Sequence, residues 1–248
     1  MTRVITFLSD YGLADEYVGV VHGVIARLAP DARVIDLGHG VPRHDVRTGA
    51  RRLARALPFT PAGVHLAVVD PGVGGGRRAV ALRCVEEERV LVGPDNGLLL
   101  PAAERLGGVA EAVEISASRW RLEPVSATFH GRDVFAPVAA RLAAGGAFAE
   151  AGVPLDVGGL VRLPAAPPGV VQVEEVDGFG NVILSRAPEA LVVAGRRVKV
   201  GRTFSDVAPG ELVLYEDSGG EPALAVNGGS AAALLGVRAG DELRVERA

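Results

Sequence analysis

The sequence predicts an α/β protein, with an N-terminal, largely parallel sheet flanked by helices and a smaller C-terminal β-barrel domain. Up to residue 163, short apolar runs alternate with segments of helical period, whereas after residue 169 short strands separated by Gly, Asp and Pro turns dominate. Between them, "LPAAPPG" suits a linker, because proline lacks the N–H that regular structure uses. The expected division is therefore 1–163, a linker at 164–169, and 170–248.

The first domain contains apolar runs of strand type and longer segments with apolar residues three or four positions apart. The expected strands are Val4–Leu8, Val34–Leu37, Val64–Val69, Ala79–Val85, Val90–Val92 and Val113–Ile115. The expected helices are Tyr17–Leu28, Val46–Leu57, Gly97–Leu106 and Val134–Ala144. In the second domain, strands are expected at "VVQVEEV", "NVILS", "RRVKV", "ELVLY" and "PALAV", with one helical turn at "GGSAAALLG".

Composition excludes several classes of protein. Of the 248 residues, 48% are hydrophobic and 23% charged, which is typical of a globular chain. The net charge of −4, without a basic block, argues against nucleic acid as a partner. Cys84 is the single cysteine, which excludes an internal disulfide and a multi-cysteine zinc site. The first apolar run is too short for a signal peptide, and none approaches the roughly 20 apolar residues of a membrane span, so we expect a cytoplasmic protein.

Acidic residues follow several predicted strands, at the edge where open α/β sheets bind ligands. Asp10 follows the first strand, Asp70 the third and Asp95 the fifth, while His130 and Asp133 directly precede a helix. Taken alone, Asp10, Asp95 or Asp133 is equally well explained as a turn former or a helix cap. Their convergence at one sheet edge favours a binding site.

The glycine-rich segment "DPGVGGGRR", from Asp70 to Arg78, resembles a phosphate-binding loop only superficially. Phosphate loops lead into a helix, whereas Arg77 and Arg78 here lead into another predicted strand. The glycines allow the backbone to approach a ligand closely, with Asp70 and an arginine at the two ends. A mobile hairpin with solvated arginines is the alternative interpretation.

The histidines raise the question of a metal site. His22 falls in a predicted helix and His65 in a predicted strand, so both are expected to be structural. The other three, His39, His44 and His130, fall in predicted loops. With Asp10 and Asp45, the loop histidines could bind a metal ion. Because no HExxH or comparable spacing is present, we expect neither a catalytic metal nor another cofactor.

The second domain offers "DGFGN" and "AVNGGSAA" as candidate binding segments. Asp-Gly is a favoured hairpin pair, so a plain turn explains the first segment well. Phe179 and Asn181 are nevertheless suited to stacking on a planar heterocycle and hydrogen-bonding its edge. Asn227 adds a second amide beside the short helix.

Six segments together resemble the S-adenosyl-L-methionine hydrolase (adenosine-forming) family, also called SAM hydroxide adenosyltransferases, which is related to the fluorinases and chlorinases. They are "SDYG", "DPGVGGGRR", "GPDNGLL", "TFHGRDVF", "DGFGN" and "AVNGGSAA", in the family's order and over nearly the whole chain. The resemblance implies a trimer, with each active site between one subunit's α/β domain and a neighbour's barrel. It implies a reaction in which water or hydroxide attacks the ribose C5′ and releases adenosine and methionine.

The resemblance also implies roles for individual residues. The family's catalytic Asp–Arg–His set falls on Asp70, Arg77 and His130, with Arg78 as a neighbour that could exchange roles with Arg77. Its ribose-binding aspartate falls on Asp10. The other expected substrate contacts are Asp15, Tyr17, Asp177 and Ser218 for methionine, Phe179, Asn181, Phe204 and Asn227 for adenine, and Phe129 within the substrate site.

Two departures from the fluorinases bear on the nucleophile. Where those enzymes have a Tyr-Ser pair, this chain has His130-Gly131, and where they have a tryptophan it has His44. Loss of the serine hydroxyl argues against a halide pocket, and the gained imidazole favours water. A SAM-binding regulator without turnover and a 5′-halogenase are the alternatives. Because hydrolysing the cell's methyl donor would be costly, the unnatural (R)-sulfonium epimer is the expected physiological substrate.

The proposed reaction is chemically reasonable for this set of residues. Displacement at a sulfonium releases a neutral thioether, so it needs an aligned nucleophile and neither a general acid nor a metal. An arginine favours hydroxide-like character in a nearby water, while an aspartate or a histidine can take or orient the proton. The sequence leaves open whether Asp70 or His130 takes it.

Overall fold

The computed structural model describes residues 4–86, 88–164, 170–188, 192–243 and 245–246. The chain divides into two units, residues 1–163 and 164–248. The predicted linker at 164–169 lies, apart from its first residue, outside the described residues. Within the described part of the chain, no helix is both long enough and apolar enough to cross a membrane.

The first unit is built on a seven-stranded sheet in the order β2-β1-β3-β5-β4-β6-β7. Its strands are β1 (Val4–Ser9), β2 (Arg33–Gly38), β3 (Gly63–Val68), β4 (Ala79–Cys84), β5 (Val90–Pro94), β6 (Val109–Glu114) and β7 (Val153–Leu155). The β2-β1-β3-β5 half is parallel, whereas β4 runs antiparallel to β5 and to β6, and β7 is antiparallel to β6. The parallel half places the carboxyl ends of β1, β3 and β5 at one edge.

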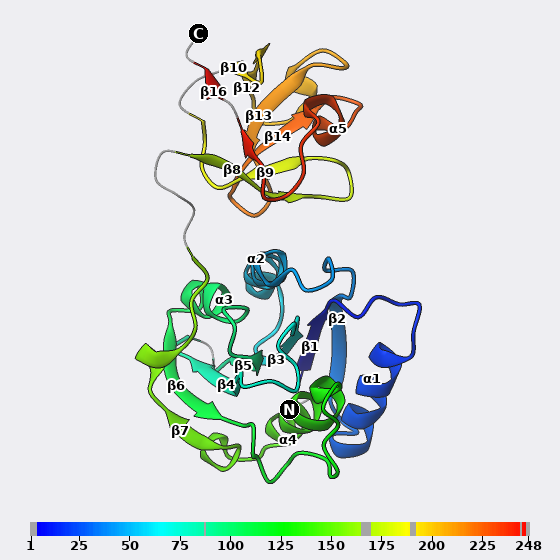
Figure 1. Ribbon diagram of the computed structural model, residues 1–248, viewed down its shortest axis with the longest axis vertical. Coiled ribbons are helices and arrows are strands. Elements are labelled where there is room, and N and C mark those ends of the chain that lie inside the picture. Colours follow the sequence, from blue (N-terminus) through cyan, green and yellow to red (C-terminus); the bar gives the residue numbers. More distant parts are fainter. Residues whose placement is uncertain (1–3, 87, 165–169, 189–191, 244, 247–248) are drawn as a thin grey trace. The chain divides into compact units, whose positions relative to one another are not determined.

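Helices cover both faces of this sheet (Figure 1). They are α1 (Tyr17–Leu28), α2 (Val46–Ala56), α3 (Leu100–Arg105) and α4 (Ala136–Ala143), with a π-helical segment at Gly131–Phe135 directly before α4. Short 3-10 segments lie at Leu57–Phe59, Phe148–Glu150 and Val157–Gly159. Helices α1 and α4 contribute to one hydrophobic core, and α2 and α3 to the other.

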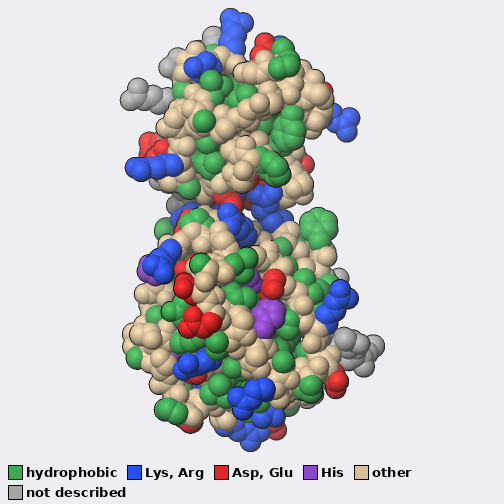
Figure 2. Space-filling model, turned by 90° about the vertical axis from the view of Figure 1, so that its right-hand side faces the viewer, with side chains coloured by type: hydrophobic (Ala, Val, Ile, Leu, Met, Phe, Trp, Pro, Cys, Tyr) green, Lys and Arg blue, Asp and Glu red, His purple; other side chains and the backbone are tan. Residues whose placement is uncertain are grey.

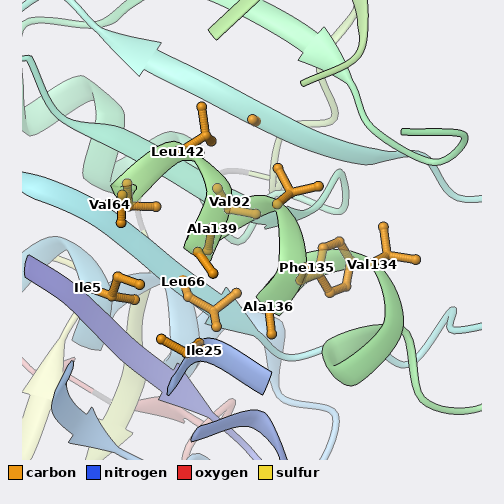
Figure 3. Close-up of a cluster of buried hydrophobic side chains, with 14 of the residues drawn as sticks. Ile5, Ile25, Val64, Leu66, Val92, Val134, Phe135, Ala136, Ala139 and Leu142 are labelled. Carbon is orange, nitrogen blue, oxygen red and sulfur yellow. The ribbon is translucent and has the colours of Figure 1, made fainter. Parts of the chain in front are cut away.

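Apolar residues that alternate along the strands supply both cores. Figure 3 shows the first, where Ile5 and Leu66 from neighbouring strands face Ile25 of α1 and Phe135 beside α4. Strand residues whose side chains point to the other face of the sheet, such as Leu8, contribute to the second core. Burial on two faces accounts for the largely apolar sequences of β1, β3 and β5, whereas the edge strand β2 has no buried residue.

Each expected element of this unit corresponds to an observed one, most of them with ends shifted by one or two residues, and three differences are larger. β6 begins at Val109, ahead of the expected Val113, and α3 is shorter than Gly97–Leu106. Pro101 explains the short helix, because it is tolerated only in the first turn and Gly107 then ends the segment. β7 was not expected, since its central residue, Pro154, is confined to edge strands.

The second unit forms two sheets, of order β12-β13-β14-β9-β8-β15 and β11-β10-β16. The strands are β8 (Val171–Val176), β9 (Val182–Leu184), β10 (Val192–Val193), β11 (Arg196–Arg197), β12 (Lys199–Val200), β13 (Leu212–Glu216), β14 (Pro222–Val226), β15 (Glu242–Leu243) and β16 (Val245–Glu246). A 3-10 segment at Phe204–Asp206 and the helix α5 (Ala231–Leu235) accompany them. The unit is therefore a sheet domain with its own core, and its closure as a barrel stays a prediction.

Candidate active site

The register of the central strands brings two predicted site residues to one edge of the sheet. Ser9, the last residue of β1, pairs with Val68, the last residue of β3. Asp10 therefore leaves the sheet beside Asp70, and its N–H donates to the Val68 carbonyl at 3.4 Å. This is the edge at which open α/β sheets bind ligands.

Arg77 connects Asp70 to His130. Its Nε donates to both Asp70 carboxylate oxygens, at 2.8 and 3.0 Å, and its Nη2 donates to Asp70 Oδ2. The same Nη2 lies 2.9 Å from His130 Nδ1. The Arg77 guanidinium also lies 5.1 Å from the centre of the Phe135 ring, in a cation–π contact. Because Arg77 and Asp70 are only 11% and 6% exposed, the solvated-hairpin interpretation does not describe this arginine.

A glycine in the loop between β3 and β4 allows this loop, which carries Arg77, to lie close to the segment that carries His130. Gly74 has φ +74°, and a Cβ atom there would lie 2.2 Å from the carbonyl oxygen of Ala127. The loop thus packs against the backbone of the segment that carries His130. Close approach was predicted for these glycines, and at Gly74 it is an approach to this chain's own backbone.

The contact with Arg77 determines which nitrogen of neutral His130 carries the proton. A guanidinium can only donate, so Nδ1 accepts and the neutral ring carries its proton on Nε2. Burial lowers the pKa of His130 from its ordinary value, and the Arg77 charge lowers it further, while Asp70 and Asp133 act in the opposite direction. The ring is therefore neutral at neutral pH and offers an Nε2–H donor.

Arg78, the neighbour of Arg77, belongs to a different interaction. Its Nε donates to Asp95 Oδ2 at 2.9 Å, and its Nη2 donates to Asp95 and to the Gly159 carbonyl. The other oxygen of Asp95 accepts from the Val161 N–H at 2.9 Å. Asp95, 3% exposed at its side chain, thus ties the end of β5 to the segment at 159–161. This is a structural contact across 66 residues, and not the turn former or helix cap of the alternative interpretation.

Asp133 also has a structural function, within its own segment of the chain. Its Oδ2 accepts from the Ser126 N–H at 2.8 Å, and its carbonyl accepts from the Leu122 N–H at 2.7 Å. Arg132 donates to both of its carboxylate oxygens. This buried aspartate holds the loop that precedes His130 in shape.

Asp10 and the residues after it form the open part of this edge. Asp10 Oδ2 accepts from the His44 N–H at 2.9 Å, and His44 has φ 65°. Asp15 is exposed, and Tyr17, at the start of α1, is 41% exposed. Tyr17 and Phe129 are in T-shaped contact, with their ring centres 5.1 Å apart.

Tyr11 completes this aromatic group, although sequence reasoning assigned it no role beyond its place in "SDYG". Its ring centre lies 5.9 Å from that of Tyr17 and 5.8 Å from that of Phe129. The charges of Asp10, Asp70 and Arg77 all act on its hydroxyl. An aromatic residue directly after the strand-end aspartate was the signal that could have identified it.

In the second unit, Asp177 is engaged within its own turn. Its Oδ1 accepts from the N–H groups of Phe179 and Asn181, each at 2.9 Å, and its Oδ2 accepts from the Asn181 side-chain amide at 2.8 Å. This is the turn that the Asp-Gly pair predicts. It leaves the Phe179 ring 84% exposed.

The other expected contacts of this unit lie on its loops. Phe204 is 44% exposed and meets Tyr215 edge to face, with ring centres 5.2 Å apart. The Asn227 side-chain amide donates to the Val207 carbonyl at 2.8 Å. Ser218 is exposed, in the turn between β13 and β14. The amide nitrogen of Asn227 therefore serves the protein backbone, while its oxygen remains the group suited to a ligand.

The histidines are distributed differently from the suggested metal set. His130 contacts Arg77, and Asp45 caps α2 through the Thr48 N–H at 2.9 Å. Buried His65 contacts Thr6, and burial lowers its pKa to about 3. These three positions are thus engaged in separate interactions, and His65 is structural, as expected.

His39 lies instead with His22 and Asp36, in the one group of the described residues whose spacing could hold a metal ion. Asp36 Oδ1 lies 2.9 Å from His22 Nε2 and 3.1 Å from His39 Nε2. Ser9 Oγ is 2.8 Å from His39 Nδ1. The His22 and Asp36 side chains are 35% and 42% exposed, and Figure 2 shows histidine and acidic side chains together on one face of this unit. The Asp36 carboxylate therefore lies between the two imidazole rings.

Known protein families match most of the chain. The model described as SAM hydroxide adenosyltransferase N-terminal domain matches residues 5–152, and the model for the C-terminal domain of the same name matches residues 171–244. A solved structure, an uncharacterized conserved protein from Thermotoga maritima, has a TM-score of 0.86 and 37% identity over 96% of this chain and 98% of its own. The similarity therefore extends over both units.

Curated relatives carry more specific names. A protein from Salinispora tropica named (R)-S-adenosyl-L-methionine hydrolase is 55% identical, over 98% of each chain. A protein of that name from Thermus thermophilus is 46% identical, over 98% of this chain and 99% of its own. A fluorinase from Nocardia brasiliensis is 27% identical, over 98% and 96% of the two chains. The hydrolases are thus much nearer to this sequence than the fluorinase is.

Proposed function

The chain belongs to the SAM hydroxide adenosyltransferase family, and from this premise we propose that it hydrolyses S-adenosyl-L-methionine to adenosine and L-methionine. The relatives at 55% and 46% identity are named for the (R)-epimer, and we propose the same sulfonium configuration for this substrate. The observation that carries the proposal is the Arg77 side chain bonded to both Asp70 and His130 at the ligand-binding edge of the sheet.

The reaction joins opposite charges. Hydroxide-like oxygen attacks the ribose C5′, the C5′–S bond breaks, and its electron pair neutralises the sulfonium as methionine leaves. Charge disappears along this path, so a pocket that excludes water favours the transition state. The leaving thioether needs no proton, and a group that aligns and activates water is sufficient.

Asp70, Arg77 and His130, which we call the trio, each have a role that follows from their contacts. The Arg77 guanidinium favours hydroxide-like character in a water bound beside it. His130, whose Nδ1 accepts from Arg77, presents Nε2–H and holds the oxygen of the water as a donor. Asp70 is the remaining acceptor, because each carboxylate oxygen has lone pairs beyond those that Arg77 occupies. We therefore assign proton removal to Asp70.

Substrate binding is assigned to the residues around this trio. The Asp10 carboxylate is suited to two vicinal ribose hydroxyls, and Asp15 and Tyr17 to the methionine end, where a carboxylate can meet the ammonium group. The exposed Phe179 ring is suited to stacking on adenine. Asn181, Phe204 and Asn227 are the further proposed adenine contacts, and Asp177 and Ser218 the further proposed methionine contacts. We propose that these groups meet in a homotrimer, each site formed by two subunits, with the second unit closing as a barrel.

A product assay tests the proposal. The protein is incubated with separately prepared (R)- and (S)-S-adenosyl-L-methionine, with and without chloride, and the products are separated by chromatography. Adenosine and methionine in equal amounts, formed faster from the (R)-epimer, are expected. A 5′-chloronucleoside would identify a halogenase, unchanged substrate a binding protein, and faster turnover of the (S)-epimer would contradict the proposed configuration.

A further inference from the structure

Gly131, next to His130, is a glycine for reasons of space. The backbone φ angle of Gly131 is not positive. The residue lies in the π-helical segment before α4, whose backbone conformation any L-residue can adopt. A Cβ atom at this position, however, would lie 2.0 Å from the Tyr11 hydroxyl oxygen and 3.1 Å from Tyr11 Cζ. The side chain of Tyr11 therefore occupies the volume that a side chain at position 131 would need.

The position of the Tyr11 ring is well defined by its neighbours. Phe7 and Phe129 meet it edge to face, at 6.3 and 5.8 Å between ring centres, and Tyr17 lies at 5.9 Å. Its backbone N–H donates to Ser9 Oγ at 3.3 Å. With its ring held on several sides, the hydroxyl has little freedom to move away from Gly131.

The Tyr11 hydroxyl lies within the electrostatic field of Asp10, Asp70 and Arg77. Burial raises the pKa of Tyr11 above its ordinary range, Asp10 and Asp70 raise it further, and Arg77 lowers it in part. The group therefore stays protonated at neutral pH and can both donate and accept. Among the described residues, no side chain or backbone group is hydrogen-bonded to this hydroxyl, which leaves it available to a ligand.

We propose that Tyr11 and Gly131 form a matched pair that shapes the nucleophile position, the Tyr11 hydroxyl filling the volume over Gly131 and hydrogen-bonding to the attacking water. This inference rests on the proposed hydrolysis. Tyr11 is a specificity-determining residue in this scheme: a neutral hydroxyl can turn either a donor or a lone pair toward water. A halide, which only accepts, gains less from it.

Single substitutions of Tyr11 and of Gly131 test the contribution of each residue to the pair. Tyr11→Phe keeps the ring contacts and removes the hydroxyl, so kcat should fall about tenfold while KM and the Kd for adenosine stay within about twofold. Gly131→Ala places a methyl group against the hydroxyl, so kcat should fall about a hundredfold and the Tm should drop. Gly19→Ala is the matched control, because a Cβ atom at Gly19 meets nothing within 4 Å and activity should be unchanged.

The double variant measures the coupling between the two positions. Replacing Tyr11 by Phe removes the atom at 2.0 Å and leaves the nearest at 3.1 Å, so Tyr11→Phe with Gly131→Ala should have a higher kcat and Tm than Gly131→Ala alone. Additive effects on both quantities, or wild-type kcat in Tyr11→Phe, would overturn the proposal. If the wild-type protein itself leaves both epimers unchanged, the proposed hydrolysis fails, whereas the coupling in Tm still tests the packing of the pair.

Discussion

In the α/β unit, Arg77 joins Asp70 to a histidine 53 residues farther along the chain, whereas in the second unit Asp177 bonds within its own turn, to residues at most four positions away. The first arrangement exists because the fold brings distant segments together. The second forms from local sequence alone. The α/β unit thus presents assembled polar chemistry, and the second unit presents exposed ring surface on a turn held by its own hydrogen bonds.

From this contrast we expect the two units to act at different steps of the proposed reaction. Groups that are buried and hydrogen-bonded to one another can be preorganised for a reaction, which lowers the barrier to chemistry. An exposed aromatic ring contributes to binding, through stacking and burial of apolar area. Substitutions in the first unit are therefore expected to act on kcat, and those in the second on KM.

The largest effect is expected at Arg77. Arg77→Met removes the partner of both Asp70 and His130, so kcat for the (R)-epimer should fall at least about a hundredfold while adenosine still binds. Steady-state kinetics and calorimetric titration with adenosine measure the two quantities. The matched control is Arg78→Met, which breaks the contacts to Asp95 and Gly159 and should lower the Tm with little change in kcat. Equal losses of kcat in both variants would contradict the assignment.

An intermediate effect is expected at Phe179. Phe179→Ala should raise KM about tenfold through loss of base stacking, with a smaller change in kcat and none in Tm, because the ring is 84% exposed. Phe59→Ala in the α/β unit is the control, since Phe59 is 82% exposed and lies outside the proposed site. A larger loss in kcat than in KM would mean that the second unit takes part in the chemistry.

The smallest effect is a change in the titration of His130. Because its pKa is lowered, the ring should protonate at a lower pH than the ordinary 6.5, and the rate should fall as the pH drops through that lowered value. NMR titration of the His130 ring measures this directly. The midpoint should rise in Arg77→Met, which removes a cation, and fall in Asp70→Asn, which removes an anion. A midpoint above 6.5 in the wild-type protein would contradict a neutral, donating ring.

Local periodicity predicted most elements of the α/β unit, because strands buried on both faces are mostly apolar and the helices are amphipathic. It could not predict that β4 runs antiparallel to β5, since strand direction depends on how distant segments pair. It also missed β7, where Pro154 interrupts an edge strand. The bounds of α1 were predicted to the residue, from Tyr17 to Leu28.

For the site, motif resemblance predicted which residues to consider, and the geometry added how they interact. Asp70, Arg77 and His130 were expected together, but the tautomer of His130 follows only from its contact with Arg77. Tyr11 could not be found by a pattern of charges, because its relevance comes from the volume it occupies over Gly131. Steric relations of this kind connect residues that no local sequence pattern links.

The sheet order has a consequence for the synthesis of the chain. β3 and β4 follow one another along the sequence but lie on either side of β5, so the loop from Asp70 to Arg78 crosses the end of a strand that is made later. Both ends of this loop, Asp70 and Arg78, are synthesised before β5, the strand that lies between β3 and β4 in the sheet. Because β5 pairs with both β3 and β4, the centre of the sheet can form only after residues 90–94 have been synthesised.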